Sequence, residues 1–420
     1  MTLAKPFKNL LIILTIFSLG AFSGYLYFNQ GQFKNAPAQE KNAPKAFVSE
    51  IYDKIKDNYW NNISDAEILD LFKLAIDKNG GQTSVAKFGS KDQLLGSIPN
   101  NASTHYLTSV VSSVLASLPP AGRSGLYTQK LEEQLKNTVE NINPEKDLYK
   151  DLGVAKSASE SEVKQAYDQQ AQKLATDSSK QAQEKLKQIS YAKDTLTRQD
   201  TKARYDQKGV EPTIFAKKIG SDILYLQFSK FSPTSLDEFQ KAFEQYKDDS
   251  SMNSLILDLR GNIGGAIDAT AYFLGFFLGK NQYAFDFYHQ GEYLPFKTPV
   301  EKLPTISKYK QVVVLVDNNT QSSAEMMAAS MKKYRIGVVV GVPTKGWGSV
   351  ERVFPLENQI NPAEKYSIFL VHSITLRDDN QPIEGRGVDP DINIKSADWE
   401  QQLFNYFRNQ ELIQVVKQVL

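Results

Sequence analysis

The chain has 420 residues, of which 41% are apolar and 23% charged, a composition that excludes a wholly disordered or collagen-like protein. Its 49 basic and 48 acidic residues nearly cancel, which argues against a nucleic-acid binder that works through bulk charge. The lack of cysteine excludes disulfides, thiolate nucleophiles and cysteine-bound metals, and three widely spaced histidines do not favour a histidine-built metal site. We therefore expect no metal and no cofactor.

The first 28 residues have the pattern of a membrane anchor. Two lysines precede a charge-free apolar run, Leu10 to Phe28, with about enough residues to span a ~30 Å hydrocarbon layer as a helix. A cleaved signal peptide is the alternative, but the bulky end of the run, with Tyr25 and Tyr27, argues against cleavage. The pattern predicts a single-pass protein of the cell membrane with a cytoplasmic N-terminus and an extracytoplasmic body. Residues 29–46 follow as a linker.

Residues 47–146 form a mostly helical region by pattern. Ser64 and Glu67 stand at capping-box spacing ahead of an apolar run, which predicts a helix start there. A weaker helix is expected at 106–117. Beyond residue 126 the chain is helical and charged up to about residue 209.

From residue 211 to 398 short β-rich runs alternate with helices. Strands are expected at 222–228, 254–259, 311–316, 336–341 and 367–376. Helices are expected between them at 234–247, 266–278 and 322–334. This alternation predicts an α/β domain with a largely parallel sheet. Residues 399–420 carry apolar side chains at helical spacing and are expected to form one packing helix.

Two turns in the α/β region follow buried strands. The first contains Gly264 and Gly265, and paired glycines at a strand-to-helix turn let backbone N–H groups face a ligand. The spacing matches neither a dinucleotide-binding nor a P-loop fingerprint. The second turn places Ser322 where a strand opens into a helix. Read alone, Ser322 is an ordinary N-cap.

Four motifs in one order change this reading of Ser322. The sequences LDLRGNIGG, VVVLVDNNTQSSAE, VGVPTKGWGSVE and DNQPIEGRGVDPDI resemble those of the C-terminal processing peptidases, or tail-specific proteases. The resemblance covers residues 214–395, and residues 46–107 are similar to the family's N-terminal helical region. It implies a ClpP/crotonase-like α/β protease core. It also implies an endopeptidase that acts on peptide or protein C-terminal tails with a serine nucleophile and a lysine base.

By this resemblance the nucleophile is Ser322. The oxyanion hole would combine the N–H of Gly264 or Gly265 with the N–H of Ser323. The chemistry is coherent, because a serine hydroxyl needs a base within reach and preorganised donors where the oxyanion forms.

The expected base is missing from its aligned position. The family's lysine position holds Trp347, whose indole only donates hydrogen bonds, and the position of the helper glutamine holds Glu351. Lys345 lies two residues before Trp347, on the same face of an extended segment, and its side chain could bridge the ~6–7 Å shift. Lys345 is therefore the best available base, with a solvated loop lysine as the alternative. His289 and His372 have no supporting context.

A second function remains open because of this change. Without a base the chain would be a pseudoprotease that binds peptide tails or partner proteins without cleaving them. An oligomer is possible in either case, and no nucleic-acid partner is expected.

Residues 147–210 stand where the family usually has a PDZ domain, and they resemble a DnaJ-type J-domain. Six side chains are expected to form its small core: Val163, Tyr167, Leu174, Leu186, Ile189 and Leu196. The His-Pro-Asp signature falls on Ala175, Thr176 and Asp177, so only the acid is retained. We therefore expect no heat-shock chaperone partner and interpret the insert as a helical spacer or a substrate-contacting arm.

Overall fold

The computed structural model describes residues 43–81 and 85–420, and the predicted anchor Leu10–Phe28 lies outside them. In the described part of the chain no helix is both long and apolar enough to cross a membrane. A spanning helix needs about 20 apolar residues, whereas the longest described helix, α9 (Lys180–Leu196), has 17 residues and is rich in charge. The predicted single-pass membrane anchor is therefore not supported.

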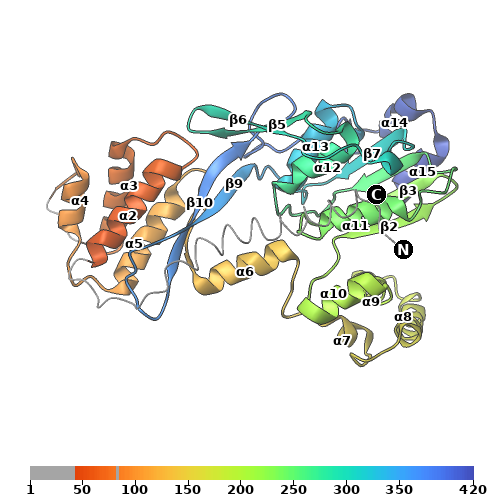
Figure 1. The fold of residues 1–420 in the computed structure, drawn as a ribbon, viewed down its shortest axis with the longest axis horizontal. Helices are drawn as coiled ribbons and strands as arrows, with labels where there is room; N and C mark the ends of the chain where they lie inside the picture. Colours follow the sequence, from red (N-terminus) through yellow and green to blue (C-terminus); the bar gives the residue numbers. More distant parts are fainter. Residues whose placement is uncertain (1–42, 82–84) are drawn as a thin grey trace, which may run out of the picture.

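The N-terminal region is a cluster of four helices, at one end of the ribbon in Figure 1. They are α2 (Ala43–Asn58), α3 (Asp65–Lys78), α4 (Lys91–Ser97) and α5 (Thr104–Ser117). The capping box expected before α3 is confirmed, because Ser64 Oγ accepts from Glu67 N–H and the Glu67 carboxylate accepts from Ser64 N–H. The apolar faces of these helices share one buried core with strand β10 (Tyr366–Thr375).

A six-stranded sheet forms the centre of the α/β region. Its strands are β2 (Ile214–Ile219), β3 (Ile223–Phe228), β4 (Ser254–Asp258), β7 (Gln311–Val316), β8 (Val338–Gly341) and β11 (Ile392–Asn393). They lie in the order β11-β8-β7-β4-β3-β2, and every neighbouring pair is parallel except β2 and β3. All five residues of β4 are buried, as expected for a central strand covered on both faces.

Helices cover both faces of this sheet, which confirms an α/β core with helical regions. Helices α11 (Ser235–Glu244), α12 (Ala269–Leu278) and α13 (Ser323–Lys333) share a core with Leu257 and Val314. Helices α14 (Trp399–Phe407) and α15 (Gln410–Val419) pack against the alternate side chains, such as Ile256 and Val313. The single C-terminal helix we expected is thus two helices, because Arg408 takes a left-handed conformation with φ 53°.

A second, antiparallel sheet links the helical region to the core. It consists of β1 (Gly125–Thr128), β5 (Tyr283–His289), β6 (Glu292–Lys297), β9 (Ser349–Pro355) and β10 (Tyr366–Thr375). Strand β10 pairs with β1, β5 and β9, and in Figure 1 β9 and β10 run from the core to the N-terminal helices. The strand expected at 367–376 therefore exists, but it does not belong to the parallel sheet.

The insert, residues 147–210, lies beside the core as a separate group of helices (Figure 1). After α6 (Gln129–Glu140) it contains α7 (Leu148–Leu152), α8 (Glu160–Leu174), α9 and α10 (Gln199–Lys208). Val163, Ile189 and Leu196 are buried in its core, and the other three expected core side chains are partly buried against them. The predicted apolar face of the insert is confirmed.

Candidate active site

Ser322 occupies a sharp turn between β7 and α13. Its backbone has φ 55° and ψ −122°, a conformation that residues other than glycine rarely adopt. The turn is held by the Gln321 N–H, which donates to the Asn262 carbonyl at 2.8 Å, and by Thr320 Oγ1, which donates to the Leu259 carbonyl at 3.0 Å. Strain of this kind persists where the surroundings impose it, and it is common at functional sites. A strand–turn–helix of this shape presents a serine hydroxyl at the sheet edge.

The glycine turn lies directly against Ser322. A Cβ added to Gly264 would lie 2.6 Å from Ser322 Cβ and 3.0 Å from Ser323 N, and its φ is +85°. A Cβ on Gly265, where φ is +135°, would lie 2.0 Å from the Phe231 carbonyl oxygen. Only glycine fits at either position, so both residues are explained by this close approach.

The geometry separates the two glycines as oxyanion donors. The Gly264 N–H donates to Asn262 Oδ1 at 2.8 Å, so it is already occupied. In residues 43–81 and 85–420, the N–H groups of Gly265 and Ser323 have no hydrogen-bond acceptor. The Ser323 hydroxyl donates to the Gly265 carbonyl at 3.1 Å and ties the two turns together. Of the two glycines that the sequence leaves open as oxyanion donors, Gly265 is the one whose N–H is free of an acceptor within the described residues.

Glu325, which the sequence reading did not single out, organises the site. Its side chain is fully buried and its carboxylate accepts from four groups. The donors are Thr344 Oγ1 at 2.5 Å, Gly346 N–H at 2.7 Å, Trp347 N–H at 2.8 Å and Ser322 N–H at 2.9 Å. Burial raises the pKa of Glu325, and the four donors oppose that shift. One carboxyl group therefore fixes the loop 344–347 against the serine turn.

Lys345 lies in this loop, close to the serine turn along the backbone. Its N–H donates to the Thr320 carbonyl at 3.0 Å, while its side chain is exposed. Within the described ranges no lysine, histidine or acidic side chain is hydrogen bonded to the Ser322 hydroxyl. The structure thus brings Lys345 near the serine turn without joining the two side chains.

Trp347 occupies the position of the missing lysine and has a cationic partner. The Arg123 guanidinium carbon lies 3.4 Å from the centre of the indole ring, a cation–π arrangement. Arg123 also pairs with Glu384 at 3.1 Å, and the Glu384 carboxylate accepts from the Gly348 N–H at 2.8 Å. A positive charge therefore remains at this position, but it comes from the segment after α5.

Glu351, at the position of the helper glutamine, is a mostly buried carboxyl group. Burial raises its pKa to about 7, although the Ser349 hydrogen bond and the nearby Arg123 charge oppose that shift. Ser349 Oγ donates to Glu351 Oε1 at 2.6 Å. A carboxyl group with this pKa changes its charge near neutrality, so the cluster around Trp347 is sensitive to pH.

The two remaining histidines of interest lie together. The rings of His289 and His372 stack with centroids 4.2 Å apart and planes 7° apart. Burial, Arg352 and His289 lower the pKa of His372 to about 4. His372 Nδ1 is hydrogen bonded to Ser373 Oγ, which places this pair within the antiparallel sheet. Neither histidine is bonded to Ser322.

The altered signature of the insert lies in an exposed loop after α8. Ala175 is the C-cap of α8, and Asp177 accepts from the Ser179 N–H at 2.8 Å, which lowers the Asp177 pKa. Thr176 bonds only to the Lys173 carbonyl. The three residues therefore have local contacts alone.

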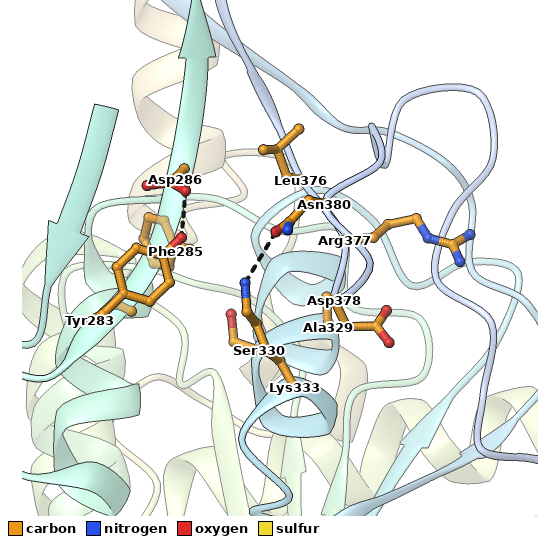
Figure 2. A pocket seen from close by; sticks show the side chains of 11 residues that line it. Tyr283, Phe285, Asp286, Ala329, Ser330, Lys333, Leu376, Arg377, Asp378 and Asn380 are labelled. Atoms are coloured by element: carbon orange, nitrogen blue, oxygen red, sulfur yellow. Dashed lines mark hydrogen bonds between the residues drawn. The ribbon is translucent and has the colours of Figure 1, made fainter. Parts of the chain in front are cut away.

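A small pocket at the far end of α13 does not belong to this site. Figure 2 shows Tyr283 bonded to Asp286 and Lys333 bonded to Asn380 around it. Its volume is about 10 Å³, enough for one water molecule at most. Lys333 ends the helix that Ser323 begins, so this cavity lies about 15 Å along α13 from the serine turn.

Comparisons with known proteins agree with these two regions. Residues 222–394 match the model of peptidase family S41, and residues 147–206 match that of the DnaJ domain. The carboxy-terminal processing protease CtpB of Bacillus subtilis is 28% identical over 190 residues, 44% of this chain and 38% of that protein. The carboxy-terminal-processing protease of Bartonella bacilliformis is 25% identical over 182 residues, 42% of this chain and 40% of that protein.

The chaperone protein DnaJ of Halobacterium salinarum is 43% identical over 77 residues, 18% of this chain and 20% of that protein. The matched part of the chain thus spans well under half the length of each of these relatives. The resemblance inferred from the motifs is confirmed: the chain combines a peptidase family S41 region with a DnaJ domain.

Proposed function

We propose that this chain is a serine endopeptidase that cuts the C-terminal tails of protein substrates, with Ser322 as its nucleophile. The observation that carries the proposal is the strained Ser322 turn, held by Glu325 beside two N–H groups without acceptors. The names of the relatives, carboxy-terminal processing proteases, supply the substrate class.

In the proposed reaction the Ser322 oxygen attacks the scissile carbonyl carbon while its proton passes to a base. The N–H groups of Gly265 and Ser323 hold the developing oxyanion, and Ser323 adds the positive end of the α13 dipole. Collapse of the tetrahedral intermediate breaks the C–N bond, and the protonated base gives its proton to the leaving amine. Water then releases the acyl group by the same steps.

The proposed base is Lys345. Its backbone N–H bonds to the carbonyl of Thr320, two residues before Ser322, and two residues span at most about 7 Å even in a fully extended chain. The lysine side chain is long enough to cover this distance. Because the side chain is exposed in the absence of peptide, the proposal requires that bound substrate covers it and displaces water. Desolvation would then favour the neutral amine that a base must supply.

A second candidate function, binding of peptide tails without cleavage, is supported by the contact between Trp347 and Arg123. Arg123 covers the indole at the position where the family has its lysine, so the original base cannot enter there. If Lys345 does not turn toward Ser322, the chain binds peptide tails without cutting them. The surface around Ser322 would then serve recognition alone.

We further propose that the region 211–398 is a ClpP/crotonase-like core, which fits a parallel sheet covered by helices on both faces. In this division residues 47–146 and 147–210 are the helical region and the insert, and 399–420 completes the core. The insert would act as a spacer or a substrate-contacting arm.

The test is incubation of the full-length chain with unstructured proteins, followed by mass spectrometry of the products. We expect cleavage by the native protein and none by Ser322→Ala. Ser330→Ala, a buried serine further along α13, is the matched control and should retain activity. Cleavage that survives in Ser322→Ala would contradict the proposal.

A further inference from the structure

A cavity of about 500 Å³ lies between the N-terminal helices, the β5–β6 hairpin and the loop after β10. Three aromatic residues line it, Trp60, Tyr288 and Tyr293, together with two prolines and the aliphatic side chains of Ile374 and Leu376. Pockets of 300–1,000 Å³ with mostly apolar walls are the usual sites for small ligands and short peptide segments. Nothing in the proposed reaction uses this cavity.

The pairing of the antiparallel sheet connects this cavity to the strand that follows Trp347. Tyr293 lies opposite Tyr288, Tyr288 opposite Ile374, and Ile374 opposite Ser349. Residues directly opposite one another in such a sheet share a face. This row of side chains therefore runs across four strands, from Tyr293 in the cavity wall to Ser349, whose hydroxyl bonds to Glu351.

A chain of hydrogen bonds gives the distance from the cavity to the serine. Glu325 accepts from the N–H groups of Ser322 and Trp347, and Glu384 accepts from the next N–H, that of Gly348. Glu384 is itself a wall of the cavity. Following these bonds, the Glu384 carboxylate in the cavity wall is at most about 12 Å from the Ser322 backbone nitrogen, which is three to four residues of an extended peptide.

We infer that this cavity is a substrate subsite that takes a bulky apolar side chain, an aromatic one above all, three to four residues from the bond cut at Ser322. The inference rests on the proposed function and names the substrate class. Stacked and edge-to-face ring contacts favour an aromatic guest. Glu384, the acidic residue in the wall, is paired with Arg123 at 3.1 Å and does not call for a cationic guest.

The walls of the cavity are held in place before any peptide arrives. The Trp60 indole N–H donates to the Pro119 carbonyl at 2.8 Å, and its ring lies 6.2 Å from that of Tyr288. Tyr293 lies at the rim and is 60% exposed, whereas Ile374 is only 3% exposed. Fixed aromatic walls lower the entropic cost of binding, and Tyr293 is the wall residue whose removal disturbs the fold least.

The test measures peptide binding by fluorescence anisotropy on the full-length Ser322→Ala protein, which binds without cutting. Two labelled unstructured peptides differ at one position, Phe in one and Ala in the other. We expect the Phe peptide to bind about tenfold more tightly, and Tyr293→Ala to reduce this preference by about three- to tenfold. Tyr293→Phe should keep the preference. Tyr406→Ala, 61% exposed on α14, is the matched control and should leave it unchanged.

Equal binding of the two peptides would overturn the subsite, and so would a preference that Tyr293→Ala leaves intact. Cleavage by the native protein is measured separately. A Phe preference that depends on Tyr293, without cleavage, would contradict the proposed endopeptidase and support the subsite. Cleavage without any Phe preference would support the proposed endopeptidase and contradict the subsite.

Discussion

The loop around Trp347 and the loop at Ala175–Asp177 both depart from the pattern of their families, but the structure surrounds them differently. Trp347 is covered by Arg123, and the N–H groups of Trp347 and Gly348 bond to Glu325 and Glu384. The loop of the insert is exposed and makes only local hydrogen bonds. A changed residue inside a network points to a rearranged site, whereas a changed residue in an isolated loop points to a function that has been dropped.

The insert nevertheless makes strong contacts elsewhere. On α10, Arg204 lies 3.1 Å from the fully buried Glu238 of α11, and the Glu238 carboxylate also accepts from the Thr213 N–H at the start of β2. The ring of Tyr191 contacts that of Phe215 at a tilt of 56°, with centroids 5.2 Å apart. The insert is therefore fixed to the core through α9 and α10, on helices that do not carry its altered loop.

Removing the proposed base should have the largest effect. We expect Lys345→Ala to lower the cleavage rate by about 10⁴-fold or more, because members of one catalytic unit do not act additively. Lys345→Arg should be equally inactive, since a guanidinium stays protonated. Initial rates with an unstructured substrate measure this. Lys395→Ala, another exposed lysine, is the control, and full activity in Lys345→Ala would refute the role of Lys345.

A second prediction concerns a lysine placed at position 347, where the resembled family has its base. In the inactive Lys345→Ala protein, Trp347→Lys should restore cleavage by at least about 100-fold, because general base catalysis is worth 10²–10⁴-fold. The Arg123 charge nearby should help, since a like charge favours the neutral amine. A rate that stays at background would mean that the position no longer faces Ser322.

The attachment of the insert can be broken at Arg204. Arg204→Ala leaves the buried Glu238 carboxylate without its cation, and we expect it to lower the free energy of unfolding by about 3 kcal/mol. Lys241→Ala removes solvent-exposed pairs with Asp237 of α11 and with Asp200 of α10, across the same interface, and should cost less than about 1 kcal/mol. Urea unfolding of both variants measures the difference, and equal losses would argue against a fixed insert.

The pH dependence of stability tests the Trp347 cluster through Glu351. Its folded-state pKa of about 7 lies above the ordinary value of 4.5, so the folded protein binds a proton more tightly than the unfolded chain. This contribution is complete below pH 4.5 and disappears as the pH rises to about 7, a loss of up to about 3 kcal/mol. Glu351→Gln should remove the loss. Unfolding at pH 5 and pH 8 measures it, and parallel curves for both proteins would contradict the burial of this carboxyl group.

Restoring the signature of the insert should have the smallest effect. Changing Ala175→His and Thr176→Pro rebuilds His-Pro-Asp in an exposed loop without contacts to the core. We expect peptide cleavage to stay within about twofold of the native rate, because surface changes of this kind are nearly neutral. A large change in the cleavage rate would show that this loop communicates with the active site.

The sequence was most informative where chemistry and local pattern coincide. The turns that hold Ser322 and the glycine pair could be located because each follows a buried strand. The capping box at Ser64 and the inward face of the insert are local patterns, and both are confirmed. Each of these features depends on residues that are close together in the chain.

Features that depend on distant residues were missed. Arg123 meets Trp347 across more than 200 residues, and the alternation within β10 does not reveal whether its neighbours are parallel. Glu325 looks like an ordinary helical glutamate until Thr344, Gly346 and Trp347 are seen to converge on it. A charged residue in the otherwise buried first turns of α13 was the one available signal.

The most direct test of the proposed peptidase is the reaction of Ser322 with a fluorophosphonate, which phosphonylates an activated serine: the serine oxygen bonds to phosphorus and fluoride leaves. Intact-mass spectrometry of the full-length protein should show one added phosphonyl group, mapped to Ser322 and absent from Ser322→Ala. The labelling rate should collapse in Lys345→Ala. A native protein that stays unlabelled at every pH, while Trp347→Lys is labelled, would contradict the proposed peptidase and favour a protein that binds tails without cutting them.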